Sequence, residues 1–156
     1  MLMSDFKFWG WDEKPRTMLR FIKPGDIFCF KLDNNKYGFG SIVSKVSIGH
    51  SAVIFDYFSS SPCVDESILD MVNVTFSLIL DSYSLFDKKI SGEWRVIGHG
   101  DFLKTFEDTY FVYGAIGERK KVDMLGNVSY ISNEESENYP PYMPKNDFHV
   151  KNMLSI

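Results

Sequence analysis

The feature that most constrains the fold is a predicted β-hairpin whose second strand contains two glycines. Its sequence, residues 25–46, reads GDIFCFKLDNNKYGFGSIVSKV. The apolar run before the turn and the β-branched run after the glycines are both typical of strands. The turn itself, Asp-Asn-Asn-Lys at 33–36, favours chain reversal because Asn and Asp tolerate left-handed backbone angles. We therefore predict two paired strands, over 25–32 and 37–46.

The alternation of side chains along this hairpin predicts which faces are buried. Ile27 and Cys29 point to one face of the first strand and phenylalanines point to the other, so both faces read as buried. In the second strand, Gly38 and Gly40 fall on the same face and leave it bare. We expect an aromatic side chain from a neighbouring strand to cover this bare patch.

The Gly-Phe-Gly sequence at 38–40 can also be compared with phosphate-binding loops. A dinucleotide-binding loop needs a third glycine and a helix directly after it, and a Walker loop needs Gly-Lys-Ser or Gly-Lys-Thr. Here a strand follows, and the lysine signature is missing from the sequence. We therefore interpret these glycines as residues that shape the sheet.

Short apolar runs separated by turn residues continue along the chain and predict a mainly β fold of the α+β kind, with few short helices. We expect a single antiparallel sheet, twisted or barrel-like, that is built from hairpins. Further strands are predicted over 50–58, 72–83, 93–100 and 110–117, with a last hairpin from 121–124 and 128–132. The helix candidates are 65–72, 101–108 and the N-terminal run 11–22.

The chain is expected to form one domain over residues 1–156, because its length suits a single hydrophobic core. We divide it into an N-terminal extension (1–20), a β core (21–132) and a tail (133–156). The tail contains three of the six prolines and little periodicity, so we expect a coil that packs on the surface. The aromatic residues Tyr139, Tyr142 and Phe148 are candidates for holding it there.

Composition and charge limit the cellular compartment and the classes of partner that we expect. The net charge of −4 and the pI of about 5.3 disfavour direct binding of nucleic acid, which needs a basic face. The sequence has neither an apolar run of membrane-spanning length nor a secretory signal, so we expect a cytoplasmic protein without a membrane partner. Cys29 and Cys63 do not make a disulfide framework, and the acidic surroundings of Cys63 disfavour a reactive thiolate.

The candidate catalytic and metal-binding residues lack the spacing of known motifs. The three histidines, His50, His99 and His149, are far apart in the sequence and lack metal-ligand spacing. Ser51 in the sequence GHSA lacks the closing glycine of a nucleophile elbow. His99 with Asp101 can be read as an acid/base pair or as a turn with a solvated imidazole, and the turn is the better reading. We predict no catalytic residue, no metal and no cofactor.

Acidic residues are clustered in two runs. Residues 46–87 contain six Asp or Glu and no Lys or Arg, and residues 122–144 contain four acids and no basic residue. Such runs can be merely solvated surface, or they can form a negative patch that attracts a basic protein. Our candidate contact residues for a basic partner are Asp65, Glu66, Asp70, Glu134, Glu135, Glu137, Tyr139 and Tyr142.

Two stretches resemble a known family. Residues 23–43 are similar to the start of the immunity protein 26 family of bacterial polymorphic toxin systems, and residues 91–100 resemble a later strand of that family. The resemblance extends from about residue 21 to residue 100, and less clearly to 142. The motif residues, which we interpret as structural, are Gly25, Asp26, Tyr37, Gly38, Phe39, Gly40, Trp94 and Gly98.

The resemblance implies a non-enzymatic protein that binds the C-terminal toxin domain of a cognate effector and protects the producing cell. Such toxins are often nucleases, including those of contact-dependent growth inhibition systems. An acidic protein can occupy the basic substrate groove of a nuclease. The resemblance therefore implies that the two acidic runs contact the toxin. The alternative is a small β-barrel module that binds a peptide or single-stranded nucleic acid. A monomer and a weak dimer are both compatible with the sequence.

Overall fold

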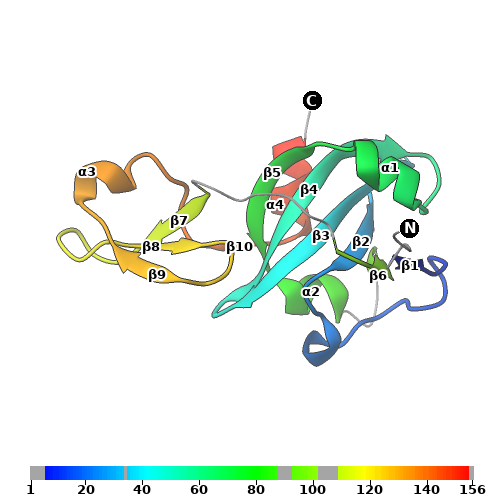
Figure 1. Ribbon diagram of the computed structural model, residues 1–156, viewed down its shortest axis with the longest axis horizontal. Helices are drawn as coiled ribbons and strands as arrows, with labels where there is room; N and C mark the ends of the chain where they lie inside the picture. The colour runs from blue at the N-terminus through cyan, green and yellow to red at the C-terminus, as the bar shows by residue number, and fades with distance from the viewer. Residues whose placement is uncertain (1–5, 34, 88–92, 102–108, 155–156) are drawn as a thin grey trace, which may run out of the picture.

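The protein, described here from a computed structural model, is mainly β with a few short helices, which confirms the predicted fold class (Figure 1). The structure describes residues 6–33, 35–87, 93–101 and 109–154. The strands form a seven-stranded sheet, called the main sheet, and a three-stranded sheet, called the small sheet. The prediction of a single sheet is therefore corrected to two sheets.

The main sheet has the strand order β1-β6-β2-β3-β4-β5-β10. Its pairings are antiparallel except that β10 runs parallel to β5, so the sheet is mixed. Among the described residues, the edge strands β1 and β10 do not pair with each other, so the sheet does not close into a barrel. The bounds are β1 Lys7–Phe8, β2 Asp26–Lys31, β3 Tyr37–Val46, β4 Gly49–Ser59, β5 Val74–Leu80, β6 Trp94–His99 and β10 Pro144–Lys145.

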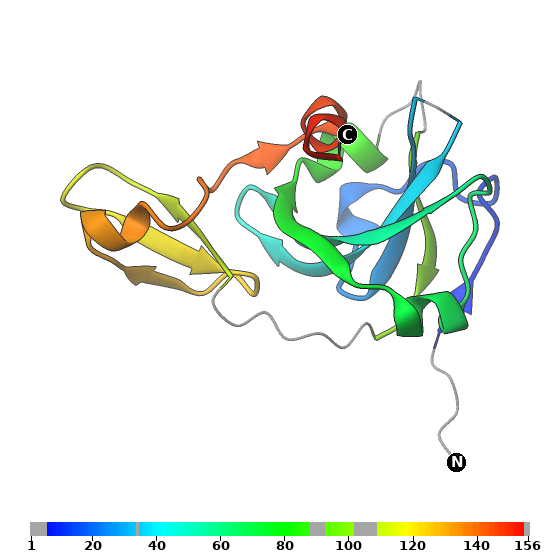
Figure 2. The ribbon, with the colours of Figure 1, turned by 90° about the horizontal axis from the view of Figure 1, so that it is seen from above.

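Each face of the main sheet carries its own hydrophobic core, as the alternation in β2 predicts. On one face, Ile27 and Cys29 belong to a cluster that includes Leu69 of α1 (Glu66–Met71). On the other face, Phe28 and Phe30 belong to a cluster covered by α2 (Ser82–Phe86) and α4 (Asp147–Leu154). Figure 2 shows α1 and α4 on opposite sides of the sheet.

The glycines of β3 allow two phenylalanine rings to lie against the backbone. Phe30 pairs with Gly38 and Phe28 with Gly40 across the β2–β3 hairpin. A Cβ atom at Gly38 would lie 2.7 Å from Phe30 Cε2, and one at Gly40 would lie 2.8 Å from Phe28 Cε1. Both distances are shorter than van der Waals contact, so the predicted aromatic cover is confirmed.

The small sheet consists of β7 (Tyr110–Tyr113), β8 (Lys120–Asp123) and β9 (Val128–Tyr130). It extends from one end of the main sheet in both views (Figures 1 and 2). Phe111 of β7 and Val122 of β8, together with Met124 in the turn after β8, join the same core cluster as Leu69. The small sheet is thus anchored through β7 and β8, while β9 is exposed to solvent.

The tail differs from the predicted coil, since it contains α3 (Asn133–Ser136), β10 and α4. Helix α4 begins with a reciprocal cap, in which Asn146 Oδ1 accepts from His149 N at 3.0 Å and His149 Nδ1 accepts from Asn146 N at 3.1 Å. Val150 buries the helix against the main sheet, whereas Phe148, predicted to hold the tail, is exposed. The predicted division into domains stays a prediction.

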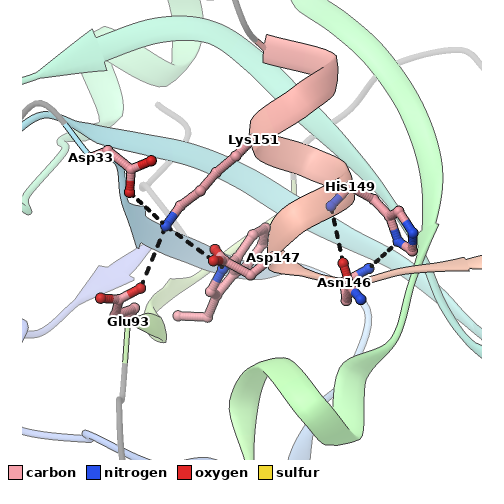
Figure 3. A network of polar contacts seen from close by, with 7 residues as sticks. Asp33, Glu93, Asn146, Asp147, His149 and Lys151 are labelled. Carbon is pink, nitrogen blue, oxygen red and sulfur yellow. Dashed lines mark hydrogen bonds and ion pairs between the residues drawn. The ribbon is translucent and has the colours of Figure 1, made fainter.

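Lys151 of α4 lies at the centre of a group of carboxylates (Figure 3). Its Nζ is 3.0 Å from Asp147 Oδ2, 3.2 Å from Asp33 Oδ1 and 3.6 Å from Glu93 Oε2. Partial burial lowers the pKa of this ammonium, but the hydrogen bonds to Asp147 and Asp33 and the charge of Glu93 raise it on balance. The group links the helix to the β2–β3 turn and to the start of β6.

The predicted helices have different outcomes. The helix at 65–72 is confirmed as α1, and the candidate at 101–108 lies outside the described residues except for Asp101. The N-terminal helix over 11–22 is wrong, because only a single 3₁₀ turn, η1 (Leu19–Phe21), forms there. The strand predicted over 72–83 is shorter in the structure, where β5 ends at Leu80 and helix α2 begins at Ser82.

Candidate interaction surfaces

The Gly25-Asp26 motif joins the start of β2 to the end of β6. Gly25 has φ +92°, a left-handed angle that favours glycine, and its N–H donates to Ile42 O at 2.9 Å. The buried carboxylate of Asp26 accepts from Lys23 N at 3.0 Å and lies 2.9 Å from His99 Nδ1. These contacts give the motif residues a structural role.

The possible acid/base pair of His99 and Asp101 is not formed. The imidazole Nδ1 of His99 contacts Asp26, which is 73 residues away in the sequence, while Asp101 is exposed. The side chain of His99 is 35% exposed. The histidine is therefore partnered by a residue of the family-like motif, and the local sequence Gly-His-Gly-Asp gives no sign of this.

Trp94 connects the motif strands to the tail. Its ring stacks on Phe30 with centroids 4.3 Å apart and lies 5.5 Å from the Phe28 ring. Its indole Nε1 donates to Asp147 Oδ1 at 2.7 Å, at the beginning of α4. Trp94 therefore packs in the hydrophobic core through its ring and orients helix α4 through its indole N–H.

His50 and Cys29 are buried groups with potential chemistry. His50 Nδ1 lies 2.6 Å from Ser82 Oγ, and its Nε2 has no partner within the described part of the chain. Burial lowers the pKa of His50, and the charge of Lys45 lowers it further, which favours the neutral imidazole. Burial raises the pKa of the Cys29 thiol, which keeps it protonated. We therefore interpret the His50 imidazole and the Cys29 thiol as packed core groups.

The first set of predicted contact residues lies on α1. Asp65 is the N-cap of this helix, since its Oδ1 accepts from Ser67 Oγ at 2.7 Å and from Ile68 N at 2.9 Å. These two hydrogen bonds hold the pKa of the Asp65 carboxyl below its usual value. Glu66 is half-buried, while Asp70 is exposed. Asp65 therefore has a helix-capping role in addition to any contact role.

The second set lies on α3 and the segment after it. Glu134 and Glu137 are exposed, and Glu135 Oε1 is 3.6 Å from Lys121 Nζ of β8. Tyr139 packs edge-on against Tyr110 with ring centroids 5.3 Å apart. Because α3 and α1 lie at opposite ends of the molecule (Figure 1), the two predicted sets do not form one continuous patch.

A groove of about 400 Å³ lies between the β3–β4 turn and the small sheet. We call it the inter-sheet groove. Tyr142, from the second predicted set, lines it and hydrogen-bonds through its hydroxyl to Ser47 Oγ at 2.9 Å. The remaining lining residues are Lys45, Val46, Tyr113, Val122, Leu125, Gly126 and Val128. The sequence could not reveal this groove, because its walls come from segments far apart in the chain.

Within the described ranges, no three or more His, Cys, Asp or Glu side chains come together as metal ligands would. The helices in these ranges are too short, or too polar, to cross a bilayer.

The fold defines a class of protein: a mainly β scaffold with a few short helices. A family model described as Immunity protein 26 matches residues 23–121, which is more than half of the chain. The chain therefore belongs to the immunity protein 26 family, which confirms the resemblance. The family name gives it the role of an immunity protein against a toxin. Neither the curated proteins nor the solved structures contain a match.

The matched residues run from the segment before β2 into β8. Strand β1 and η1 precede the match, and β9, α3, β10 and α4 follow it. Two of these elements, β1 and β10, form the two edges of the main sheet. In the main sheet, the family-matched strands are thus flanked on both sides by strands outside the match.

Proposed function

We propose that this protein binds and neutralises the C-terminal toxin domain of a bacterial polymorphic or contact-dependent inhibition effector. The observation that carries the proposal is the family match over residues 23–121. The toxin is proposed to be a nuclease acting in the cytoplasm, where the immunity protein meets it. Protection then comes from occupying the toxin surface and involves no chemical step on the part of the immunity protein.

The half of the molecule that contains the small sheet is the proposed main contact. Glu134 and Glu137 expose their carboxylates at α3, at the outer end of this half, while Tyr139 packs on β7 and Tyr142 lines the inter-sheet groove. Aromatic anchors beside a groove are typical of the residues that contribute most to binding, and carboxylates match the positive substrate groove of a nuclease. The acids of α1 form a second surface, which we retain as a secondary contact.

The function is tested by co-expression. The toxin domain encoded beside this chain is expressed alone and together with the wild-type protein, and growth is measured. We expect growth to stop with the toxin domain alone and to recover with the pair. Continued arrest in the presence of the folded immunity protein would refute the proposed function.

The contact surface is tested by two matched sets of charge reversals, Glu134→Lys with Glu137→Lys on α3, and Glu66→Lys with Asp70→Lys on α1. Asp65 is left unchanged because it caps α1. For the α3 set, we expect the association rate with the toxin domain to fall by about tenfold or more and its salt dependence to flatten. A smaller loss is expected for the α1 set. Unchanged association rates in both sets would show that these acidic residues do not lie in the interface.

A further inference from the structure

The N-terminal segment carries the opposite charge to the rest of the chain. Residues 6–24 contain five Lys or Arg and two Asp or Glu, whereas the whole chain has a net charge of −4. The same segment contains Trp9 and Phe21, and the Phe21 side chain is 58% exposed. Basic and aromatic residues are therefore concentrated in one short stretch of an otherwise acidic protein.

Contacts with the main sheet and with α2 hold this segment in place. Trp9 N donates to Ile97 O at 2.9 Å, and Trp9 Nε1 donates to Val96 O at 2.6 Å. Further along, Thr17 N donates to Phe86 O at 3.0 Å, and Arg16 forms an ion pair with Asp87. Between these contacts, Trp11 packs edge-on against Tyr37 of β3 with ring centroids 5.3 Å apart, and its carbonyl oxygen accepts from Arg95 Nη1 at 2.9 Å.

A cavity of about 410 Å³ lies beneath this segment, and we call it the N-terminal cavity. Its walls include Trp9, Lys14, Thr17, Phe21 and Lys23, and the buried Asp26 forms part of the lining. The volume falls within the range of pockets that hold a small ligand or a buried side chain. The buried Thr17 Oγ1 has no hydrogen-bond partner among the described residues, so this hydroxyl group of the cavity wall can hydrogen-bond to a ligand.

The charges around the cavity indicate what it can hold. Lys14 and Lys23 form no ion pair with any carboxylate in the described part of the chain, and Lys14 Nζ lies 4.1 Å from the centre of the Trp9 ring. Arg16 is neutralised by Asp87, while Asp26 contributes one negative charge. Two cations and one carboxylate leave about one positive charge, which matches a monoanion. A phosphate dianion fits less well, because Asp26 would repel it.

We propose that the N-terminal cavity binds a carboxylate side chain, together with an adjacent apolar side chain, presented by the partner protein. The partner is the toxin of the proposed function, on which this inference rests. Lys14 and Lys23 hold the carboxylate, and the exposed Phe21 and the Trp9 ring receive the apolar neighbour. The immunity protein therefore contacts its partner through the basic N-terminal cavity as well as through its acidic surfaces.

The test uses the full chain and a peptide probe without any toxin. The blocked dipeptide N-acetyl-Phe-Glu-amide is titrated while the NMR resonance of the Trp9 indole N–H is followed, with assignment from a Trp9→Phe variant. We expect a saturable shift at millimolar concentrations and little shift with N-acetyl-Phe-Gln-amide, because the amide lacks the charge.

Two double variants localise the effect. Lys14→Glu with Lys23→Glu reverses the cavity charges, and the apparent dissociation constant for the Glu dipeptide is expected to rise at least tenfold. Lys31→Glu with Lys36→Glu makes the same change in net charge on exposed residues at the other end of β2 and should leave binding unchanged. Circular dichroism confirms that both variants fold.

Three outcomes would overturn the proposal. These are an absent shift, an equal response to the Gln dipeptide, and tighter binding of inorganic phosphate, which would make the cavity a phosphate or nucleic-acid site. Because the titration contains no toxin, its failure leaves the proposed function standing. The co-expression experiment tests that function separately.

Discussion

The two sheets of this protein bury their residues to very different extents. In β2 of the main sheet, five of six residues are buried, and both faces carry a core. In the small sheet, β8 has one buried residue of four, and all three residues of β9 are exposed. Packing therefore constrains the identity of nearly every residue in β2, whereas packing constrains few residues in β8 and β9, whose sequence can vary to suit a partner.

The largest expected effect compares an aromatic residue from each sheet. Phe30→Ala removes a fully buried ring that stacks on Trp94, so the free energy of unfolding should fall by about 3–5 kcal/mol. Tyr130→Ala in β9, where the side chain is 74% exposed, should change it by less than about 0.5 kcal/mol. Urea denaturation measures both, and equal losses would contradict the comparison.

The next effect concerns the backbone of β3. Gly40→Ala places a methyl group against the Phe28 ring and the β4 backbone, so we expect a loss of about 1–3 kcal/mol. Gly10→Ala is the matched control, because the nearest atom to its new Cβ would be at 3.7 Å. A Gly40→Ala protein as stable as the control in thermal unfolding would show that the rings can move aside.

A smaller effect compares lysines from the two regions. Lys151→Met removes the partner of three carboxylates around α4 and should cost about 1 kcal/mol, less in high salt. Lys121→Met in β8 removes one ion pair, at 3.6 Å from Glu135, and should cost less. Denaturation at low and high ionic strength measures both. A larger loss for Lys121→Met would reverse the ranking of the two regions.

The smallest effect is a pH dependence that arises in the main sheet. Because the folded protein holds the pKa of His50 below its usual value of 6.5, protonation favours the unfolded state. The contribution of His50 is complete above pH 6.5 and is lost as the pH falls below it. We expect His50→Gln to flatten the fall in unfolding free energy between about pH 6.5 and pH 5. An unaltered slope in the variant would assign the dependence to other groups.

The sequence predicted the parts of the fold that depend on neighbouring residues. The β2–β3 hairpin, the two buried faces of β2 and the aromatic cover over Gly38 and Gly40 all follow from alternation within 25–46. Helix α1 corresponds to the helix candidate at 65–72, and its cap at Asp65 is local to the helix. In each case the deciding information lies within a few residues.

The parts that could not be predicted depend on contacts between distant residues. Helix α4 is stabilised by the burial of Val150 and by the hydrogen bond from Trp94 to Asp147, 53 residues apart. The partner of His99 is likewise distant, and the walls of the inter-sheet groove come from both sheets. The N-terminal cavity was missed for a related reason, because a net charge of −4 obscures a local basic segment.

The position of β10 in the chain has a consequence for folding during synthesis. The outer edge of β5 is completed only by Pro144–Lys145, after the whole small sheet has been translated. Until then, the nascent chain exposes an unpaired strand edge together with the core face that α4 later covers. Chaperone binding to ribosome-bound intermediates should therefore persist through β9 and end once the α4 segment has emerged.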